Sequence, residues 1–306
     1  MQRTFLIGLS ICLLGVEILQ AQNFAGDMAL SKILIEGEGW TRLSSGHGFT
    51  DGAATDAKGN FYFSGRQQGK ASIFKISPEG SVSVFIKDAP GISGLQFSPS
   101  GTLFGTRWGK NDIVSIAKDG TLKKIATGNH PNDLVITHRG HLYFTNHDGV
   151  HRLDESNVPQ LVADHLQGPN GISLSPDQGT LVVSEYGGKH VWAYRIERDG
   201  SLRFGEPYMT MRLPVNAEAA KGDGATTDIE GRYYVTSALG IQMFDATGRI
   251  SGVIAKPSSS GVSNVEFAGP KHQYLYVTAG GEVYRRLTKT RGFLFFEDPR
   301  DRKAAK

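Results

Sequence analysis

A six-fold repeat is the feature that most constrains what this chain can fold into. Each copy has a polar lead residue, a short apolar strand, a turn and a second strand that ends near a Ser or Thr. The copies are FTDGAATDAKGNFYFS (49–64), ISGLQFSPSGTLFGT (92–106), HPNDLVITHRGHLYFT (130–145), PNGISLSPDQGTLVVS (169–184), KGDGATTDIEGRYYVTS (221–237) and SNVEFAGPKHQYLYVT (263–278). The lead residues are Asp51, Ser93, Asn132, Asn170, Asp223 and Asn264.

Successive lead residues lie 42, 39, 38, 53 and 41 residues apart. A period of roughly 40–45 residues that carries several short strands is typical of a β-propeller blade. The sequence therefore predicts an all-β fold, a six-bladed β-propeller with four-stranded blades around a central channel. Because such a ring closes by combining strands from both ends, we expect residues 32–36 or 40–43 to complete the last blade. The step of 53 residues leaves room for a loop over residues 207–221, which we expect to overhang one face of the disc.

The two ends of the chain differ from the repeats. Residues 1–21 have a basic start and an apolar run and end at a small alanine, which is typical of a secretory signal peptide. We therefore expect a secreted or periplasmic protein, with a propeller domain at 22–290 and a C-terminal tail at 291–306 whose last charged residues are frayed. The only cysteine, Cys12, lies in the leader, so the exported chain would be stabilised by its core and not by disulfides.

The charge pattern bears on the partners. The net charge of +3 comes from 33 basic and 30 acidic residues, and no dense basic run interrupts the repeats. This argues against nucleic acid as a partner, and removal of the leader would leave no membrane segment. We expect a monomer that takes a small molecule. The chain has no G-x-S-x-G, H-E-x-x-H or phosphate-loop motif, which argues against the usual serine hydrolases, zinc proteases and nucleotide enzymes.

Four of the lead residues form a candidate metal site. Residues in one repeat register lie at the same radius and height of a propeller, so the lead residues should converge at one mouth of the channel. Asp51, Asn132, Asn170 and Asp223 would supply two carboxylates and two amide oxygens. This all-oxygen set suits one divalent cation, Ca²⁺ first, with Mg²⁺ or Mn²⁺ as alternatives and Zn²⁺ as the least suited. The alternative is structural, because Asx residues commonly cap turns and all six leads are polar.

The second strand of each copy runs back toward the same mouth, so the residues near its end should form the rim of a pocket. We predict substrate contacts there from His130, His147, Arg66, Arg107 and Glu185. The two histidines could also act as acid or base groups, since histidine titrates near neutral pH. The alternative for each histidine is a solvated loop residue.

Four segments resemble the SMP-30/gluconolactonase/LRE-like family: HPND (130–133), GPNGISLSPD (168–177), VVSEYGGKHVWAY (182–194) and GDGATTD (222–228). The resemblance implies a six-bladed propeller with one divalent metal, commonly calcium, in the channel mouth, and in many members hydrolysis of sugar lactones. Asn132, Asn170 and Asp223 match the family's metal-ligand positions. The family's first ligand is normally a glutamate in E-G-P, and this chain has Asp51 in T-D-G, one methylene shorter. His130 stands where many lactonases carry a substrate-contacting arginine, which leaves sugar-lactone specificity open.

The resemblance also implies a mechanism. A metal polarises the lactone carbonyl while Asp223, as catalytic residue, serves as general base for the attacking water. Two alternatives remain at this stage. One is a non-catalytic propeller that binds a carbohydrate or a protein through the mouth, and the other is phosphotriester hydrolysis at the same metal site.

Overall fold

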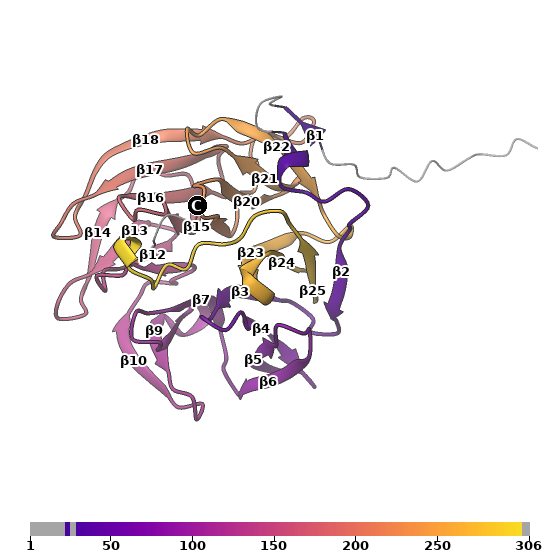
Figure 1. Ribbon diagram of the computed structural model, residues 1–306. Helices are drawn as coiled ribbons and strands as arrows, with labels where there is room; N and C mark the ends of the chain where they lie inside the picture. The colour runs from indigo at the N-terminus through magenta and orange to yellow at the C-terminus, as the bar shows by residue number, and fades with distance from the viewer. Residues whose placement is uncertain (1–21, 25–28, 302–306) are drawn as a thin grey trace, which may run out of the picture.

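The computed structural model describes residues 22–24 and 29–301, and it forms a ring of six antiparallel sheets (Figure 1). The predicted six-bladed β-propeller is therefore confirmed. The first three blades contain β3 (Asp51–Thr55), β4 (Phe61–Gln67), β5 (Lys70–Ile76) and β6 (Val82–Lys87); β7 (Ile92–Phe97), β8 (Leu103–Arg107), β9 (Asp112–Ile116) and β10 (Leu122–Thr127); and β11 (Leu134–Ile136), β12 (Leu142–Asn146), β13 (Gly149–Leu153) and β14 (Pro159–Ala163). The predicted signal peptide lies outside the described residues.

The fourth and fifth blades contain β15 (Pro169–Leu174), β16 (Thr180–Glu185), β17 (His190–Ile196) and β18 (Leu202–Thr210); and β19 (Ala225–Thr227), β20 (Tyr233–Ser237), β21 (Gly240–Phe244) and β22 (Ile250–Ala255), beside which lies β1 (Gln22–Asn23). The sixth contains β23 (Val262–Ala268), β24 (Tyr274–Ala279), β25 (Glu282–Leu287) and β2 (Thr41–Ser44). In this part of the chain no helix is long and apolar enough to cross a membrane.

The core lies between neighbouring blades and not at the centre of the ring. Between the third and fourth blades, for example, Val135 and Tyr143 pack in one cluster with Leu174, Leu181 and Val183. Each sheet is covered on both faces by its neighbours, which explains why the inner strands are apolar on both sides. The polar residues at the strand ends are left to form the two openings of the channel.

Strands from the two ends of the chain close the ring. β2 pairs with β25 as the outermost strand of the sixth blade, which confirms the expectation for residues 40–43. The alternative for residues 32–36 was wrong, because Lys32 ends a 3₁₀ turn, η1 (Leu30–Lys32), and Leu34 makes an isolated bridge to Thr288 but no strand. Leu30 and Ile33 are buried in the cluster between the fifth and sixth blades, so this stretch contributes core side chains and no blade strand.

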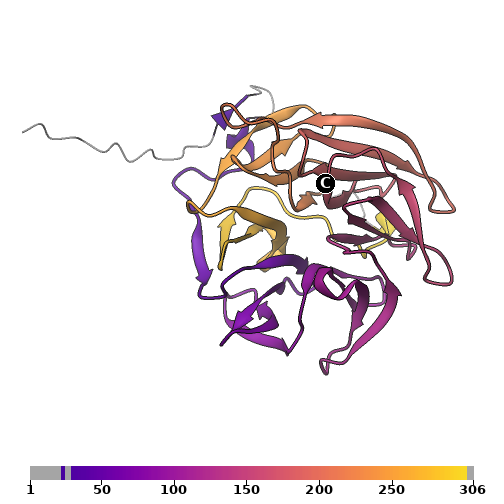
Figure 2. The same ribbon diagram turned by 180° about the vertical axis from the view of Figure 1, so that it is seen from behind.

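The C-terminal tail crosses the ring at the ends of the innermost strands, opposite the lead residues (Figure 1). Its Phe293 N–H donates to Thr227 O at 3.1 Å, and Gln178 Nε2 donates to Phe295 O at 2.7 Å. Phe293 and Phe295 are buried. Figure 2 shows the ring from the other side, with the tail behind the strands. The tail thus covers one end of the channel and leaves the lead residues at the other.

The segment after β17 differs from the expected loop. Residues 207–210 belong to β18, and Met209 and Met211 are buried between the fourth and fifth blades, so the loop prediction was wrong for its first part. The reason is that the apolar side chains continue the blade packing past Pro207. The later part has no strand, but Gly222 N–H donates to Glu185 O at 3.1 Å, which fixes it at the channel mouth.

Candidate metal centre

The lead residues meet at one end of the channel, as the repeat register predicts. Asn132 Nδ2 donates to Asn170 Oδ1 at 2.6 Å, and Asn264 Nδ2 donates to Asp51 Oδ1 at 3.0 Å. A hydrogen bond from the Asn170 side chain also lowers the pKa of Asp223. Side chains from five of the six blades are therefore within hydrogen-bonding reach of a neighbour at the mouth.

Exposure separates the four expected ligands from the other two leads. Ser93 and Asn264 are buried, with 8% and 6% of their surface exposed. The four residues that remain partly accessible from the mouth are Asp51, Asn132, Asn170 and Asp223. The turn-capping alternative does not predict this difference, whereas a binding site does.

A bulge at the start of the innermost strand aims the lead side chains. The pairing register shifts between Asp51 and Ala53 in the first blade, and similar irregularities occur at the start of the innermost strand in the second, fourth and sixth blades. A bulge bends its strand and redirects side chains locally. The lead residues can therefore face the channel while the strand that follows them packs between blades.

Hydroxyl groups fix the backbone of the leads across the blade boundaries. The Ser or Thr near the end of a second strand donates to a carbonyl at the start of the next blade. These bonds are Thr106 Oγ1 to Asn132 O, Thr145 Oγ1 to Asn170 O at 2.5 Å, Ser184 Oγ to Asp223 O at 2.8 Å and Thr236 Oγ1 to Ser263 O at 2.9 Å. Each of these four blades thus positions the lead region of its successor, which accounts for the Ser or Thr at this position in these four copies of the repeat.

Three acidic side chains lie close together at the mouth, and among the described residues no Lys, Arg or His contributes to the pKa shifts of these three carboxyl groups. Burial raises the pKa of Asp51 to about 6, and burial together with repulsion from Asp51 and Asp133 holds the pKa of Asp223 well above its usual range. Burial and repulsion from Asp51 likewise raise the pKa of Asp133. Three carboxyl groups therefore share one desolvated region, which is the electrostatic setting that a bound cation relieves.

These donors fit a hard divalent cation. The described ranges contain no group of three or more His, Cys, Asp or Glu side chains placed to hold a metal, so the amide oxygens of Asn132 and Asn170 would have to complete the set. Carboxylate and amide oxygens are ligands of Ca²⁺ and Mg²⁺, and the four lead residues include no sulfur or imidazole group that would favour zinc. Asp133 was not among the site residues predicted from the sequence, although its carboxyl group interacts with those of Asp51 and Asp223.

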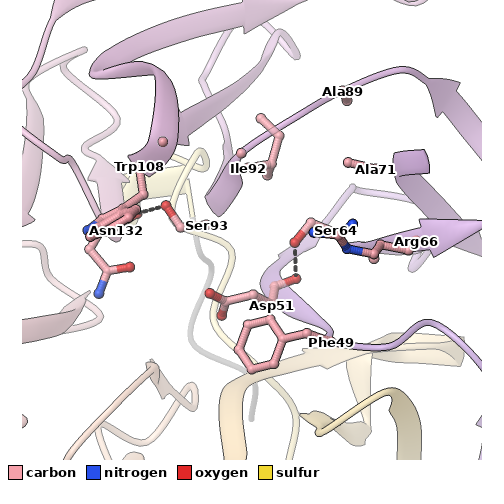
Figure 3. A pocket seen from close by; sticks show the side chains of 13 residues that line it. Phe49, Asp51, Ser64, Arg66, Ala71, Ala89, Ile92, Ser93, Trp108 and Asn132 are labelled. Carbon is pink, nitrogen blue, oxygen red and sulfur yellow. Dashed lines mark hydrogen bonds between the residues drawn. The ribbon is translucent and has the colours of Figure 1, made fainter. Parts of the chain in front are cut away.

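A pocket of about 450 Å³ opens beside this centre, between the first and second blades (Figure 3). Asp51 and Asn132 line its inner part, and Arg66 lies on the side away from Asn132. A molecule in this pocket would therefore lie next to the candidate metal ligands.

Two predicted substrate contacts lie near this pocket, His130 on the loop between the second and third blades and His147 in the turn between β12 and β13 of the third blade. His130 packs against Trp108, with ring centroids 4.8 Å apart, and its Nδ1 is 3.1 Å from Trp108 O. If Nδ1 carries the proton for this bond, Nε2 is left as an acceptor. The His147 ring lies 6.1 Å from that of His130, and its Nε2 is 3.1 Å from Asp148 Oδ1.

Arg107 and Glu185 are already engaged by the protein. Arg107 Nε and Nη2 donate to the Asp112 carboxylate at 2.7 and 2.6 Å. Glu185 is 2% exposed, and its carboxylate accepts hydrogen bonds from Trp192 Nε1 at 2.8 Å and from two backbone N–H groups. This geometry favours a structural role for both residues over the predicted contact with a substrate.

Fold and site together define a six-bladed propeller with an oxygen-rich channel mouth. The family model described as SMP-30/Gluconolactonase/LRE-like region matches residues 121–281, more than half of the chain. The protein therefore belongs to this family.

Named relatives agree with this assignment. A gluconolactonase of Zymomonas mobilis subsp. mobilis is 27% identical over 264 residues, covering 71% of this chain and 72% of its own. A solved gluconolactonase of Xanthomonas campestris matches with a TM-score of 0.72 at 22% identity, over 88% of this chain and 94% of that one. Regucalcin of Agrobacterium tumefaciens, described as a calcium-binding protein, matches with a TM-score of 0.70 at 15% identity, over 85% and 98%. At these identities the two structures support the fold alone.

Proposed function

We propose that this protein is a metal-dependent hydrolase of the gluconolactonase type that opens a lactone ring. The observation that carries the proposal is the convergence of Asp51, Asn132, Asn170 and Asp223 as the partly accessible leads beside a pocket. The named gluconolactonase relatives supply the reaction class. The calcium-binding description of regucalcin supports Ca²⁺ as the first cation to test.

The reaction needs a polarised carbonyl, a positioned water and a proton acceptor. A divalent cation held by these oxygens would polarise the lactone carbonyl and stabilise the negative charge that develops on it. Asp223 would accept a proton from the attacking water, whose oxygen forms a bond to the carbonyl carbon. The bond from that carbon to the ring oxygen then breaks, and the ring oxygen takes the proton as an alcohol. The product is one hydroxy acid, and no other reactant is consumed.

The test is turnover of a lactone panel by protein stripped with a chelator and then supplied with Ca²⁺, Mg²⁺, Mn²⁺ or Zn²⁺ singly. Proton release from aldonolactones and simple lactones should stop after stripping and return with one cation. Full activity in excess chelator would remove the metal from the mechanism. Tight cation binding without turnover of any lactone would favour a propeller that binds a carbohydrate or protein. A phosphotriester in the same panel tests that alternative directly.

We also propose that the chain is exported and acts as a monomer with a small-molecule substrate. The support for export is the basic and apolar character of residues 1–21. N-terminal sequencing of protein from the periplasmic or culture fraction should begin after Ala21, and an intact N-terminus in the cytoplasm would contradict export. Light scattering of the purified protein checks the monomer.

A further inference from the structure

The pocket beside the candidate metal centre has apolar walls. Phe49, two residues before Asp51, is 59% exposed, and Trp108, at the start of η2 (Trp108–Lys110), is 55% exposed. Figure 3 shows Phe49 beside Asp51, and Trp108 beside Asn132 on the other side of the pocket. The rest of the lining includes Ala71, Ala89 and Ile92. The pocket therefore offers mainly carbon surface next to the candidate ligands.

The polar groups of the pocket are largely occupied by the protein itself. Ser64 Oγ donates to Asp51 O at 3.0 Å, and Ser93 Oγ donates to Asn132 O at 3.0 Å. An aldonolactone carries several hydroxyl groups, and each costs free energy when it is buried without a hydrogen-bond partner. Apart from the expected metal ligands, Arg66 is the charged side chain that this lining offers to such a ring. The pocket is thus poorly equipped for a polyhydroxylated substituent.

The backbone that carries Trp108 is held in place by the protein itself. The backbone N–H of Trp108 donates to Gly91 O at 2.9 Å, and the Arg107–Asp112 ion pair closes the turn from which Trp108 projects. Large aromatic side chains are normally removed from water, and those that remain exposed in a concave site commonly contact a ligand. A backbone that is already ordered at Trp108 lowers the entropy that is lost when a ligand binds.

We infer that the substrate is a lactone bearing an apolar alkyl or aryl substituent, which the Phe49 and Trp108 side chains contact. This inference rests on the proposed hydrolase function and specifies its substrate class. The lactone ring would lie toward Asp51 and Asn132, and the apolar substituent would extend between the two aromatic side chains toward Ala71 and Ala89.

Three substrates test the inference in the wild-type protein with its preferred cation. γ-Decalactone and γ-butyrolactone share one ring and differ by a hexyl chain, and glucono-δ-lactone carries hydroxyl groups instead. We expect kcat/KM for γ-decalactone to exceed the other two by at least about tenfold, a difference of about 1.4 kcal/mol in transition-state binding. The separation should appear mainly in KM, because the chain binds far from the reacting bond.

Substitutions of Phe49 and Trp108 test whether these two side chains cause the substrate preference. Phe49→Ala and Trp108→Ala should each lower the ratio of kcat/KM for γ-decalactone over γ-butyrolactone by about three- to tenfold. Phe49→Leu and Trp108→Phe keep an apolar side chain and should retain most of the preference for γ-decalactone over γ-butyrolactone. Phe204→Ala is the matched control, because Phe204 is 69% exposed on the outer strand β18 of the fourth blade. An unchanged ratio in both alanine variants would overturn the assignment of these side chains.

The outcomes separate this inference from the function on which it rests. If no lactone is turned over with any cation, the hydrolase proposal itself fails. If kcat/KM for glucono-δ-lactone or γ-butyrolactone equals or exceeds that for γ-decalactone, the proposed hydrolase function stands and the proposed apolar substrate class is wrong.

Discussion

Asp223 and Asp228 flank the same innermost strand, β19, and meet opposite electrostatic conditions. Asp228, at the end covered by the tail, accepts hydrogen bonds from Arg232 Nε at 2.7 Å and from Tyr234 Oη at 2.9 Å. Two backbone N–H groups, those of Glu230 and Arg232, donate to its other oxygen, Oδ1, at 3.0 Å. Asp223, at the mouth, faces Asp51 and Asp133, and in the described part of the chain its charged form is favoured by hydrogen bonds from the Asn170 side chain and the Gly224 backbone N–H.

This difference indicates that the two ends of β19 have different roles. Burial raises the pKa of both carboxyl groups, but at Asp228 the charge of Arg232 and several hydrogen bonds oppose that shift. A buried carboxylate that is already paired within the protein is costly to leave without its partner, and its oxygens are already used as hydrogen-bond acceptors. A carboxylate left among like charges can be relieved only by a proton or an external cation. The strand therefore carries a structural acid at one end and a candidate functional acid at the other.

The largest expected effect comes from Asp223→Asn. We expect lactone turnover to fall on the order of 10²–10⁴-fold, because the amide keeps the shape but cannot accept the proton of the attacking water. Stability should be unchanged or slightly higher, since one of three mutually repelling carboxyl groups is removed. Steady-state kinetics and urea unfolding of the same preparation measure the two quantities. A variant with normal kcat and normal cation binding would exclude Asp223 from the mechanism.

Asp228→Asn should show the reverse pattern. Removing Asp228 leaves the buried Arg232 guanidinium with the exposed Glu230 carboxylate as its remaining ion-pair partner in the described part of the chain, and loss of a buried partner costs up to about 3–5 kcal/mol of unfolding free energy. Turnover per folded molecule should stay close to wild type, because Asp228 is separated from the mouth by the length of β19. Loss of turnover at temperatures where circular dichroism shows a fully folded variant would contradict a purely structural role for Asp228.

Glu266 is a third buried acid, and it differs from Asp223 and Asp228 in its hydrogen-bond partners. Its Oε1 accepts hydrogen bonds from Thr226 Oγ1 at 2.9 Å and from Phe267 N–H at 2.7 Å, and burial raises its pKa to about 8 from an ordinary 4.5. The folded state therefore keeps a proton that the unfolded chain has released between those two values. Stability from this group is present at low pH and is lost as the pH rises through this window.

Glu266→Gln should remove that dependence while Oε1 still accepts both hydrogen bonds. Relative to wild type, the unfolding free energy of the variant should rise by about 2–3 kcal/mol between pH 5 and pH 7, at about 1.4 kcal/mol per pH unit. Urea unfolding at several pH values measures this difference. Parallel curves for the two proteins would show that Glu266 is already ionised in the folded state.

The repeat register predicted the blades and the four accessible leads, because a propeller places equivalent residues at equivalent positions. It did not predict Asp133, because the alternation of side chains along a regular strand would turn the residue after Asn132 away from the mouth. The partners of Arg107 and Glu185 were also missed. Asp112 lies directly opposite Arg107 across the β8–β9 ladder, which was a local signal that hairpin pairing could have revealed.

The smallest predicted effect concerns the hydroxyls between blades, and two serines of the fourth blade allow a matched comparison. Ser184 Oγ donates to Asp223 O at 2.8 Å at the mouth, whereas Ser173 Oγ lies 2.9 Å from Thr227 Oγ1, nearer the covered end. Both serines are fully buried. Ser184→Ala and Ser173→Ala should each cost about 1 kcal/mol of stability, the usual value of one such hydrogen bond.

Only Ser184→Ala should also weaken cation binding and turnover, by about three- to tenfold, because it frees the backbone that positions Asp223. Calorimetric titration with Ca²⁺ and kcat measured at saturating cation distinguish a displaced ligand from a general loss of stability. If the two variants lose activity equally, the hydroxyl is a packing feature with no special role at the mouth. If Ser184→Ala alone is impaired, the hydroxyl of Ser184 has a function in the site of the next blade, and the mouth differs from the covered end in its backbone support as well as in its charge.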